Sequence, residues 1–276
     1  MRALPQPFSK FFADRGPHLA AMIAYFALLS FVPLLFLTVS LLGLAGRPDE
    51  SSYLVTELKR AFPGSSVASI VHTVDSIRKH ATALGIVGGA ALLWASLSLF
   101  SVLESAMNIV YGQPNRSFLR GKLLAVGLML LSLVTLFVGL LAGSFGFDLL
   151  KRYAAGFASN SYVAYGLSIA VSLLGVFVFL FAIYYFLTNV EHSFADVLPG
   201  AVFSAVALEA SFQVLPLYVR YSGNVVALKA FGGPALLLVW LYVMANVIVF
   251  GAEVNWRYAE KHQRLPANEE EAAGLA

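Results

Sequence analysis

The sequence predicts an all-α, polytopic membrane protein with six transmembrane helices and an amphipathic helical connector between the first two. Of its 276 residues, 59% are hydrophobic and 12% are charged, and the mean hydropathy is +0.79. Soluble domains carry about 25% charged residues. Six stretches stay apolar for the length of about 20 residues that crosses a bilayer as a helix. We therefore expect residues 1–276 to form a single integral membrane domain.

The first predicted span covers about residues 19–45. It is too long for the apolar core of a signal peptide, so we expect it to stay attached as an anchor. Pro33 lies inside it and removes one backbone hydrogen bond, which predicts a point where the helix flexes. Residues 46–82 are too polar to cross a membrane. Apolar residues recur there at helical spacing, so we expect interfacial helices on the periplasmic side.

Five further spans follow, at about 83–111, 123–147, 162–187, 197–219 and 234–256. Aromatic residues mark several of their ends, as they do at the water boundary of membrane proteins. Pro216 lies in the fifth span and predicts a second point of flexing. Residues 257–276 form a polar tail, which we expect to be cytoplasmic. Small-residue pairs such as Gly85 with Gly89 allow helices to approach closely, so a homo-oligomer is an open alternative.

Polar residues at membrane depth form the candidate functional site, because a charged side chain near the centre of a span costs about 2.5–3.5 kcal/mol. Glu209 lies deepest, about twelve residues into the fifth span, and Gln213 follows one turn later on the same face. We interpret this stripe as the lining of a cavity that binds a proton, a cation or part of a substrate. The alternative is a carboxyl group buried between helices by hydrogen bonds.

Two other polar faces end at the same side of the membrane. The second span carries Glu104 and Asn108, and the sixth carries Asn246 and Glu253. We expect these residues to line the cavity at its cytoplasmic mouth, although an intrahelical ion pair with Arg257 is the alternative for Glu253. Basic residues in and after the loop that follows the second span are predicted to attract anionic lipid head groups, namely Arg116, Arg120 and Lys122.

Several classes of site are missing from the sequence. The chain has no cysteine, which excludes disulfides, thiol nucleophiles and Cys-ligated metals. It has no P-loop for ATP, and its five histidines lack the spacing of a zinc helix. The 18 basic residues are nearly balanced by 15 acidic ones, unlike those of a nucleic-acid-binding protein. We expect no cofactor, no metal, no nucleic-acid partner and no enzyme activity.

Three stretches resemble the bacterial YihY/BrkB family, once labelled ribonuclease BN, and the resemblance covers about Phe11 to Tyr258. They are AYFALLSFVPLL at 24–35, LPGA at 198–201, and WLY at 240–242 continuing to GAEVN at 251–255. The resemblance implies six helices, both termini in the cytoplasm and residence in the bacterial inner membrane. It also implies a link to envelope integrity or lipid movement. The ribonuclease label does not fit the chemistry, because the sequence has no basic groove and no metal cluster.

These features predict a transporter-like protein that moves an envelope lipid or another amphiphile between leaflets without its own ATPase. Its partners are then membrane lipids. Glu209 and Gln213 line the cavity, and Pro33 and Pro216 let helices flex. The alternative hypothesis is a non-catalytic membrane scaffold that binds envelope-assembly proteins.

Overall fold

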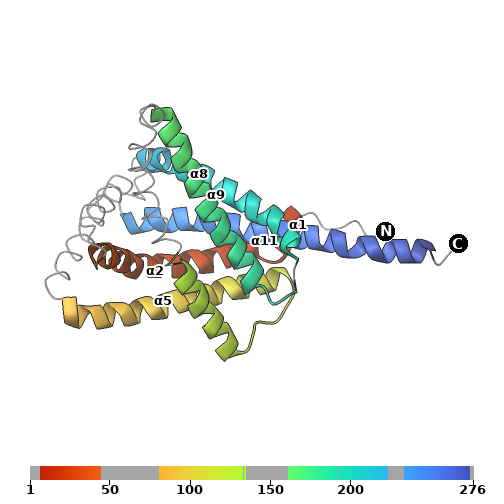
Figure 1. The fold of residues 1–276 in the computed structure, drawn as a ribbon, viewed down its shortest axis with the longest axis horizontal. Coiled ribbons are helices and arrows are strands. Elements are labelled where there is room, and N and C mark those ends of the chain that lie inside the picture. Colours follow the sequence, from red (N-terminus) through yellow and green to blue (C-terminus); the bar gives the residue numbers. More distant parts are fainter. Residues whose placement is uncertain are drawn as a thin grey trace, which may run out of the picture. The chain divides into compact units, whose positions relative to one another are not determined.

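The structure is a computed structural model that describes residues 7–44, 81–132, 134, 161–191, 193–222 and 233–273. Its regular elements are helices (Figure 1). In chain order they are α1 (Pro7–Ala13), α2 (Gly16–Leu44), α5 (Ala81–Val110), α8 (Ser161–Ala182), the π-helical turn η1 (Ile183–Leu187), α9 (Phe194–Ser222) and α11 (Gly233–Ala273). Residues 118–132 are also helical. The all-α prediction is confirmed.

Four helices of the described chain are long and apolar enough to cross a membrane. Their apolar parts are Leu93–Val110, Ile169–Leu187, Phe194–Val214 and Leu237–Lys261, and they overlap the second, fourth, fifth and sixth predicted spans. The start of α2, Gly16–Phe31, is a shorter apolar helix. The connector at 46–82 and the second half of the third predicted span, 123–147, lie largely outside the described residues.

Backbone chemistry explains why these apolar stretches are helical. In lipid no water is available to the peptide groups, so each N–H and C=O must be satisfied within the segment, as it is in an α-helix. Both prolines that the sequence marks for flexing lie inside continuous helices, Pro33 in α2 and Pro216 in α9. Their side chains lie outside the described residues.

The chain divides into two compact units. Unit 1 comprises Met1–Ala20, Leu103–Glu209 and Asn246–Ala276, and unit 2 comprises Ala21–Val102 and Ala210–Ala245. Helices α2, α5, α9 and α11 each contribute residues to both units.

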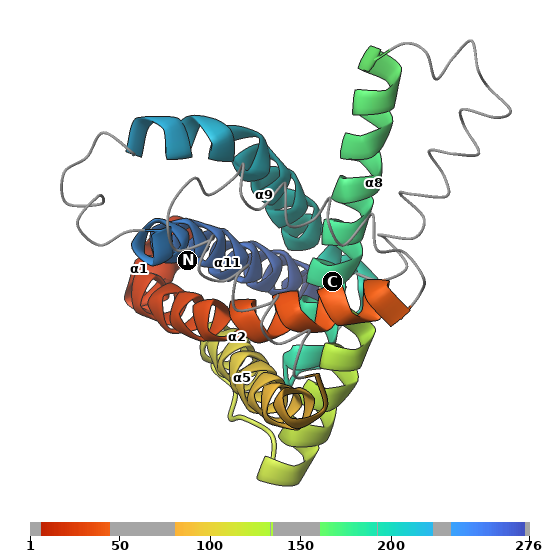
Figure 2. The same cartoon turned by 90° about the vertical axis from the view of Figure 1, so that its left-hand side faces the viewer.

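Unit 2 contains most of α2 and the first part of α5, which run alongside each other in both views (Figures 1 and 2). Its hydroxyl groups bond back to their own helix: Ser30 Oγ donates to the Phe26 carbonyl and Ser98 Oγ to the Trp94 carbonyl, at 2.8 and 2.7 Å. This internal bonding satisfies a hydroxyl group in apolar surroundings. Tyr25 and Trp94 are exposed, as expected of helices surrounded by lipid.

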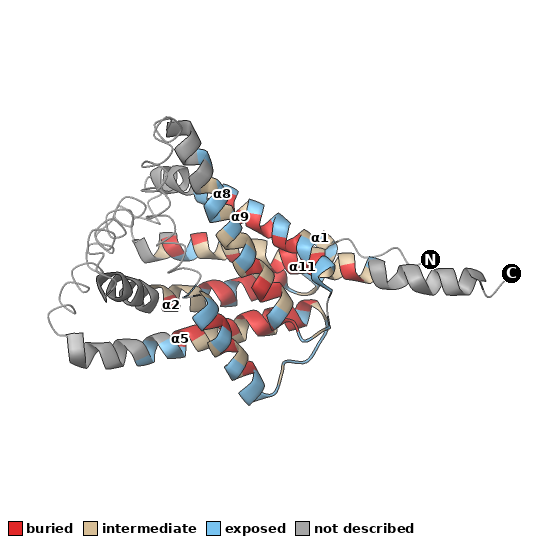
Figure 3. Ribbon diagram, viewed as in Figure 1, coloured by how far each residue is buried: buried red, intermediate tan, exposed pale blue. Residues whose placement is uncertain are grey.

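Unit 1 has a core of buried apolar side chains. Figure 3 shows buried positions on the C-terminal part of α5 and along α11. The buried apolar side chains that these helices share with α8, η1 and α9 include Leu103, Met107, Val110, Leu180, Ile183, Leu187, Val197, Leu208 and Val249. Polar side chains lie within the same core, and they form the candidate site described below.

Two glycines let α9 and α11 cross at close range within unit 1. A Cβ on Gly200 would overlap the carbonyl oxygen of Gly251, and a Cβ on Gly251 would overlap Ser204 Oγ and Tyr184 Oη. The backbones are close enough for Asn255 Oδ1 on α11 to accept a hydrogen bond from the Gly200 N–H at 2.6 Å. The absence of a side chain at both positions therefore determines how near these helices lie.

We predict that Gly251→Ala destabilises the protein, because the new methyl group must displace Ser204 or Tyr184. Overpacking a filled core lowers the free energy of unfolding by about 1–3 kcal/mol. Thermal unfolding in detergent micelles measures the effect. Gly175→Ala on α8 is the matched control, since nothing lies within 4 Å of its Cβ position and alanine favours a helix. Equal stability of the two variants would contradict the close crossing.

Candidate functional site

A guanidinium group holds the C-terminal end of η1. The chain leaves this π turn in an extended conformation at Thr188. Arg116 Nη1 donates to the Leu187 carbonyl at 2.6 Å, and Nη2 donates to the Thr188 carbonyl at 2.8 Å. The last carbonyl groups of a helix have no partner within it, and they carry the negative end of the helix dipole. Arg116 therefore caps this end by both hydrogen bonding and charge.

Glu104 of α5 supplies the counter-charge for Arg116. Its carboxylate is buried; Oε1 accepts a hydrogen bond from the Arg116 backbone N–H at 3.2 Å and lies 3.6 Å from Nη1. The chain packs tightly around this group, since a Cβ on Gly121 would lie 2.9 Å from Oε2. The structure thus places Glu104 in a buried ion pair that stabilises the end of η1.

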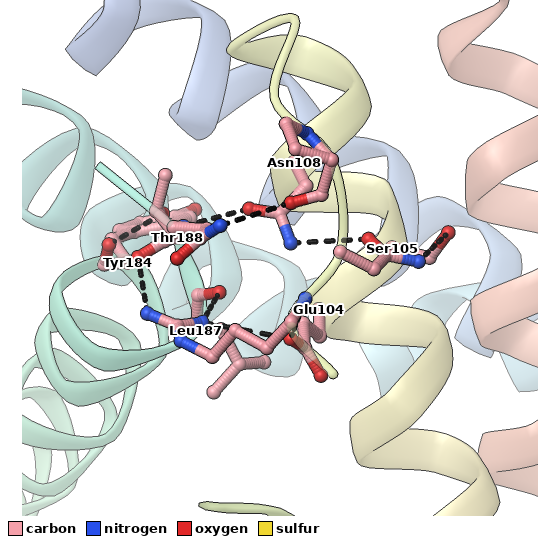
Figure 4. Close-up of polar contacts among 10 residues, drawn as sticks. Glu104, Ser105, Asn108, Tyr184, Leu187 and Thr188 are labelled. Carbon is pink, nitrogen blue, oxygen red and sulfur yellow. Dashed lines mark hydrogen bonds and ion pairs between the residues drawn. The ribbon is translucent and has the colours of Figure 1, made fainter. Parts of the chain in front are cut away.

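Asn108 lies one turn beyond Glu104 on α5 and joins two chain segments. It is fully buried; Oδ1 accepts a hydrogen bond from the Asn189 N–H at 2.7 Å, and Nδ2 donates to Asn115 Oδ1 at 3.1 Å. Asn115 Nδ2 in turn donates to Ser105 Oγ at 3.3 Å. Figure 4 shows Asn108 and Ser105 near Glu104. The structure therefore brings the two predicted polar residues of the second span into one network.

A second cation caps the end of α5. Lys10 Nζ, on α1, donates to the carbonyl of Val110, the last residue of α5, at 2.5 Å. The same ammonium group forms ion pairs with Asp14 and with Glu253 Oε2, the latter at 3.1 Å. It also lies 4.4 Å from the centroid of the Trp256 ring, a cation–π contact. Lys10 thus joins α1, α5 and α11.

Glu253 is bonded differently from Glu104. Its side chain is 0% exposed, and neither carboxylate oxygen accepts a hydrogen bond within the described chain. The 3.1 Å approach of Lys10 is therefore an ion pair without hydrogen-bond geometry. The ionic partner of Glu253 is Lys10 and not Arg257, the alternative that the spacing on α11 suggested.

Glu209 is buried on α9, and its hydrogen bond leads to a different helix. Oε2 accepts a hydrogen bond from Ser172 Oγ of α8 at 2.7 Å, and Ser172 itself is exposed. Gln213, one turn later on α9, is exposed and belongs to unit 2. Asn246 is half-buried on α11 in unit 1. Of the predicted cavity residues, Glu209 thus makes a polar contact between two helices that are long enough to span a bilayer.

The three basic residues predicted to bind head groups differ in position. Arg116 points into the protein, as described above. Arg120 is exposed, and Lys122 is half-buried with Nζ 5.8 Å from the centroid of the Phe118 ring. Beside them on the helix that includes 118–132, large apolar side chains are 72–77% exposed, namely Phe118, Leu119 and Leu123. Charged and apolar side chains therefore lie next to each other at the start of this helix.

Sequence reasoning missed several buried polar groups in unit 1. Tyr184 Oη donates to the Ile248 carbonyl and shares a hydrogen bond with Ser204 Oγ, each at 2.8 Å. The contacts of Lys10 with Val110 and Glu253 gave no signal, because both residues lie far along the chain. A signal did exist for Gly200 and Asn255, because both lie in the strings that carry the family resemblance.

The part of the chain that the structure describes contains no cluster of three or more His, Asp or Glu that could hold a metal ion. Several polar groups of unit 1, such as Asn108 and Arg116, instead bond to other polar side chains or to helix ends.

Comparison with known proteins identifies one family. The family model described as Virulence factor BrkB matches residues 8–275. YfkH of Bacillus subtilis, named only as ribonuclease-like, is 28% identical over 274 residues, which are 96% of this chain and 98% of that protein. A UPF0761 membrane protein of Tolumonas auensis is 26% identical over 261 residues, 89% of this chain and 83% of that protein.

A longer relative is a UPF0761 membrane protein of Pseudomonas aeruginosa, 27% identical over 263 residues. The match covers 88% of this chain but 59% of that protein. No solved structure matches the chain.

We predict that Arg116→Ala destabilises the protein, because it removes two carbonyl caps and leaves Glu104 buried without a counter-charge. Breaking a buried pair from one side costs about 3–5 kcal/mol; we expect the lower end, since the Arg116 side chain is 23% exposed. Thermal unfolding in detergent measures the loss. The double variant Arg116→Met with Glu104→Gln should recover part of it, and Arg120→Ala should change little. A loss no larger than that of Arg120→Ala would contradict the cap.

Proposed function

The chain belongs to the virulence factor BrkB family, and from this membership we propose that it is a transporter-like protein of the bacterial inner membrane. It moves an envelope lipid or another amphiphile between leaflets, has both termini in the cytoplasm and uses no ATPase of its own. The relatives named as membrane proteins and the four apolar helices of the described chain support a multi-pass location.

The observation that carries this proposal is the buried carboxylate of Glu209. It lies on one helix that is long enough to span a bilayer and accepts a hydrogen bond from Ser172 on another. A carboxyl group at membrane depth is costly and marks a substrate or proton path more often than a packing contact. Because Ser172 is exposed, the carboxylate lies one hydrogen bond away from the surface, where a polar head group can reach it.

We assign no ribonuclease activity to the chain. Two of the buried or half-buried basic side chains in unit 1 contact the protein itself: Arg116 caps η1 and pairs with Glu104, and Lys10 caps α5 and pairs with Glu253. An RNA-binding groove would instead present basic side chains to the phosphate backbone.

Arg120 and Lys122 are the proposed contact for anionic head groups. Their charges lie beside the exposed apolar side chains of Phe118, Leu119 and Leu123. This combination is typical of residues at a bilayer surface, where apolar groups enter the lipid and basic groups stay with the phosphates.

A membrane scaffold for envelope-assembly proteins is the second candidate. It is favoured by the length of α11, which continues as a helix to Ala273, past the end of its apolar part at Lys261. The extension carries three consecutive glutamates at 269–271 and, at about 1.5 Å per residue, is long enough to contact another protein. The scaffold predicts no lipid exchange, together with a partner that is lost when residues 266–276 are deleted.

We predict that Glu209→Gln slows lipid exchange by about tenfold or more, which corresponds to about 1.4 kcal/mol of barrier. The purified protein is reconstituted in liposomes with labelled phospholipids, and leaflet exchange is measured with and without a pH gradient. Glu191→Gln is the matched control, because it makes the same change at an exposed carboxylate. Exchange at the wild-type rate by folded Glu209→Gln protein would remove Glu209 from the mechanism. No exchange by the wild type would favour the scaffold.

We also predict that Arg120→Gln with Lys122→Gln weakens the interaction with anionic lipid by about 1 kcal/mol per residue. The measurement is the rise in unfolding temperature when phosphatidylglycerol, rather than phosphatidylcholine, is added to the detergent-solubilised protein. The double variant should lose most of the difference between the two lipids, and high salt should reduce it in the wild type. An unchanged preference for phosphatidylglycerol would place the head-group contact elsewhere.

A further inference from the structure

One ammonium group and two carboxylates share a site in unit 1 where α1 meets α5 and α11. Lys10 Nζ forms ion pairs with both Asp14 and Glu253, and it also donates to the Val110 carbonyl. With every group ionised, the cluster of Lys10, Asp14 and Glu253 carries a net charge of −1. A net charge in a largely buried site is unfavourable, and binding one proton cancels it.

The two carboxylates of this cluster are not equivalent. The Asp14 side chain is 23% exposed, so water can solvate its charge, whereas that of Glu253 is 0% exposed. Neither oxygen of Glu253 accepts a hydrogen bond within the described chain. Its charge is therefore the less well stabilised of the two, and the proton belongs on Glu253.

The other groups near Glu253 leave this charge count unchanged. Tyr111, just beyond the end of α5, is within electrostatic range of the carboxylate, and its phenol group is neutral. Arg257, one turn further along α11, is half-buried and forms no ion pair with Glu253 in the structure as described.

Glu104, in the same unit, belongs to an ion pair whose charges cancel and can be compared with Glu253. It faces one cation, Arg116, and accepts a hydrogen bond from the Arg116 backbone N–H. One positive and one negative charge cancel, so this pair carries no net charge. The difference between the two sites lies in Asp14, a second carboxylate that competes for the same ammonium group.

We propose that the cluster of Lys10, Asp14 and Glu253 is a proton-binding site that holds one proton on the Glu253 carboxylate. The proton comes from a hydronium ion of the solvent: one of its O–H bonds breaks as an O–H bond to a Glu253 oxygen forms, and water is left. Once it is bound, the remaining charges are the Lys10–Asp14 pair, both in the segment that begins with α1. This inference goes beyond the proposed function, because proton binding takes place whether or not the protein moves lipid.

Infrared spectroscopy of the purified full-length protein tests the proposal. Protonated carboxyl groups give a C=O stretching band that carboxylates lack, and spectra recorded across a pH series follow its loss. We expect a band in the wild type that is absent from Glu253→Gln, which has the shape and charge of the protonated acid and so should fold. Glu191→Gln makes the same change at an exposed carboxylate; it is the matched control and should retain the band.

Asp14→Asn gives a second, directional test. Without the competing carboxylate, Lys10 and ionised Glu253 form a neutral pair, so the proton should bind about tenfold more weakly and the band should disappear at a lower pH. The proposal is overturned if Glu253→Gln retains the full wild-type band at every pH. It is also overturned if folded Asp14→Asn protein loses the band at the same pH as the wild type or at a higher one.

Discussion

Two helix ends inside unit 1 impose the constraint on which its polar core depends. The C-terminal carbonyl groups of α5 and η1 lie at Val110 and Leu187, both of which are buried, and a helix offers no internal partner for them. Lys10 and Arg116 provide the donors. A cation brought into such a place needs a counter-charge, because the cost of removing it from water is otherwise not offset.

The same balance of charges distinguishes the roles of three glutamates that have similar surroundings in the sequence. Each is a carboxylate on an apolar helix, yet Glu104 completes the charge balance of a helix cap, Glu253 belongs to a cluster with one negative charge in excess, and Glu209 contacts a hydroxyl group on α8. A buried carboxylate is therefore not by itself a sign of transport. Whether it serves structure, proton binding or substrate contact depends on the number of cations that face it and on the donors that reach it.

Much of the fold could be predicted from the sequence, because the length and hydropathy of a span are local properties. The fourth predicted span ends at residue 187, where η1 ends. The shared face of Glu104 and Asn108 also follows from helical spacing. The pairing of Lys10 with Glu253 could not be predicted, because it joins opposite ends of the chain.

The role of Arg116 was equally hidden from sequence reasoning. A basic residue in a short loop looks the same whether it faces a lipid phosphate or a helix end. Its role depends on where the carbonyl groups of η1 lie in space. The spacing of apolar residues does not reveal the π turn. The contact between Arg116 and the end of η1 therefore could not be predicted from the sequence.

The π turn affects the direction in which side chains in the middle of α8 point. A π turn contains one more residue than an α-helical turn, and each residue of an α-helix rotates the chain by about 100°. Arg116 holds the carbonyl end of η1. The additional residue of the π turn therefore rotates the preceding residues of α8 about the helix axis. In an uninterrupted α-helix with the same end point, Ser172 would face a direction about 100° away and would not meet Glu209. The direction in which that hydroxyl group points thus depends on a contact about four turns away, made by a guanidinium group from another loop.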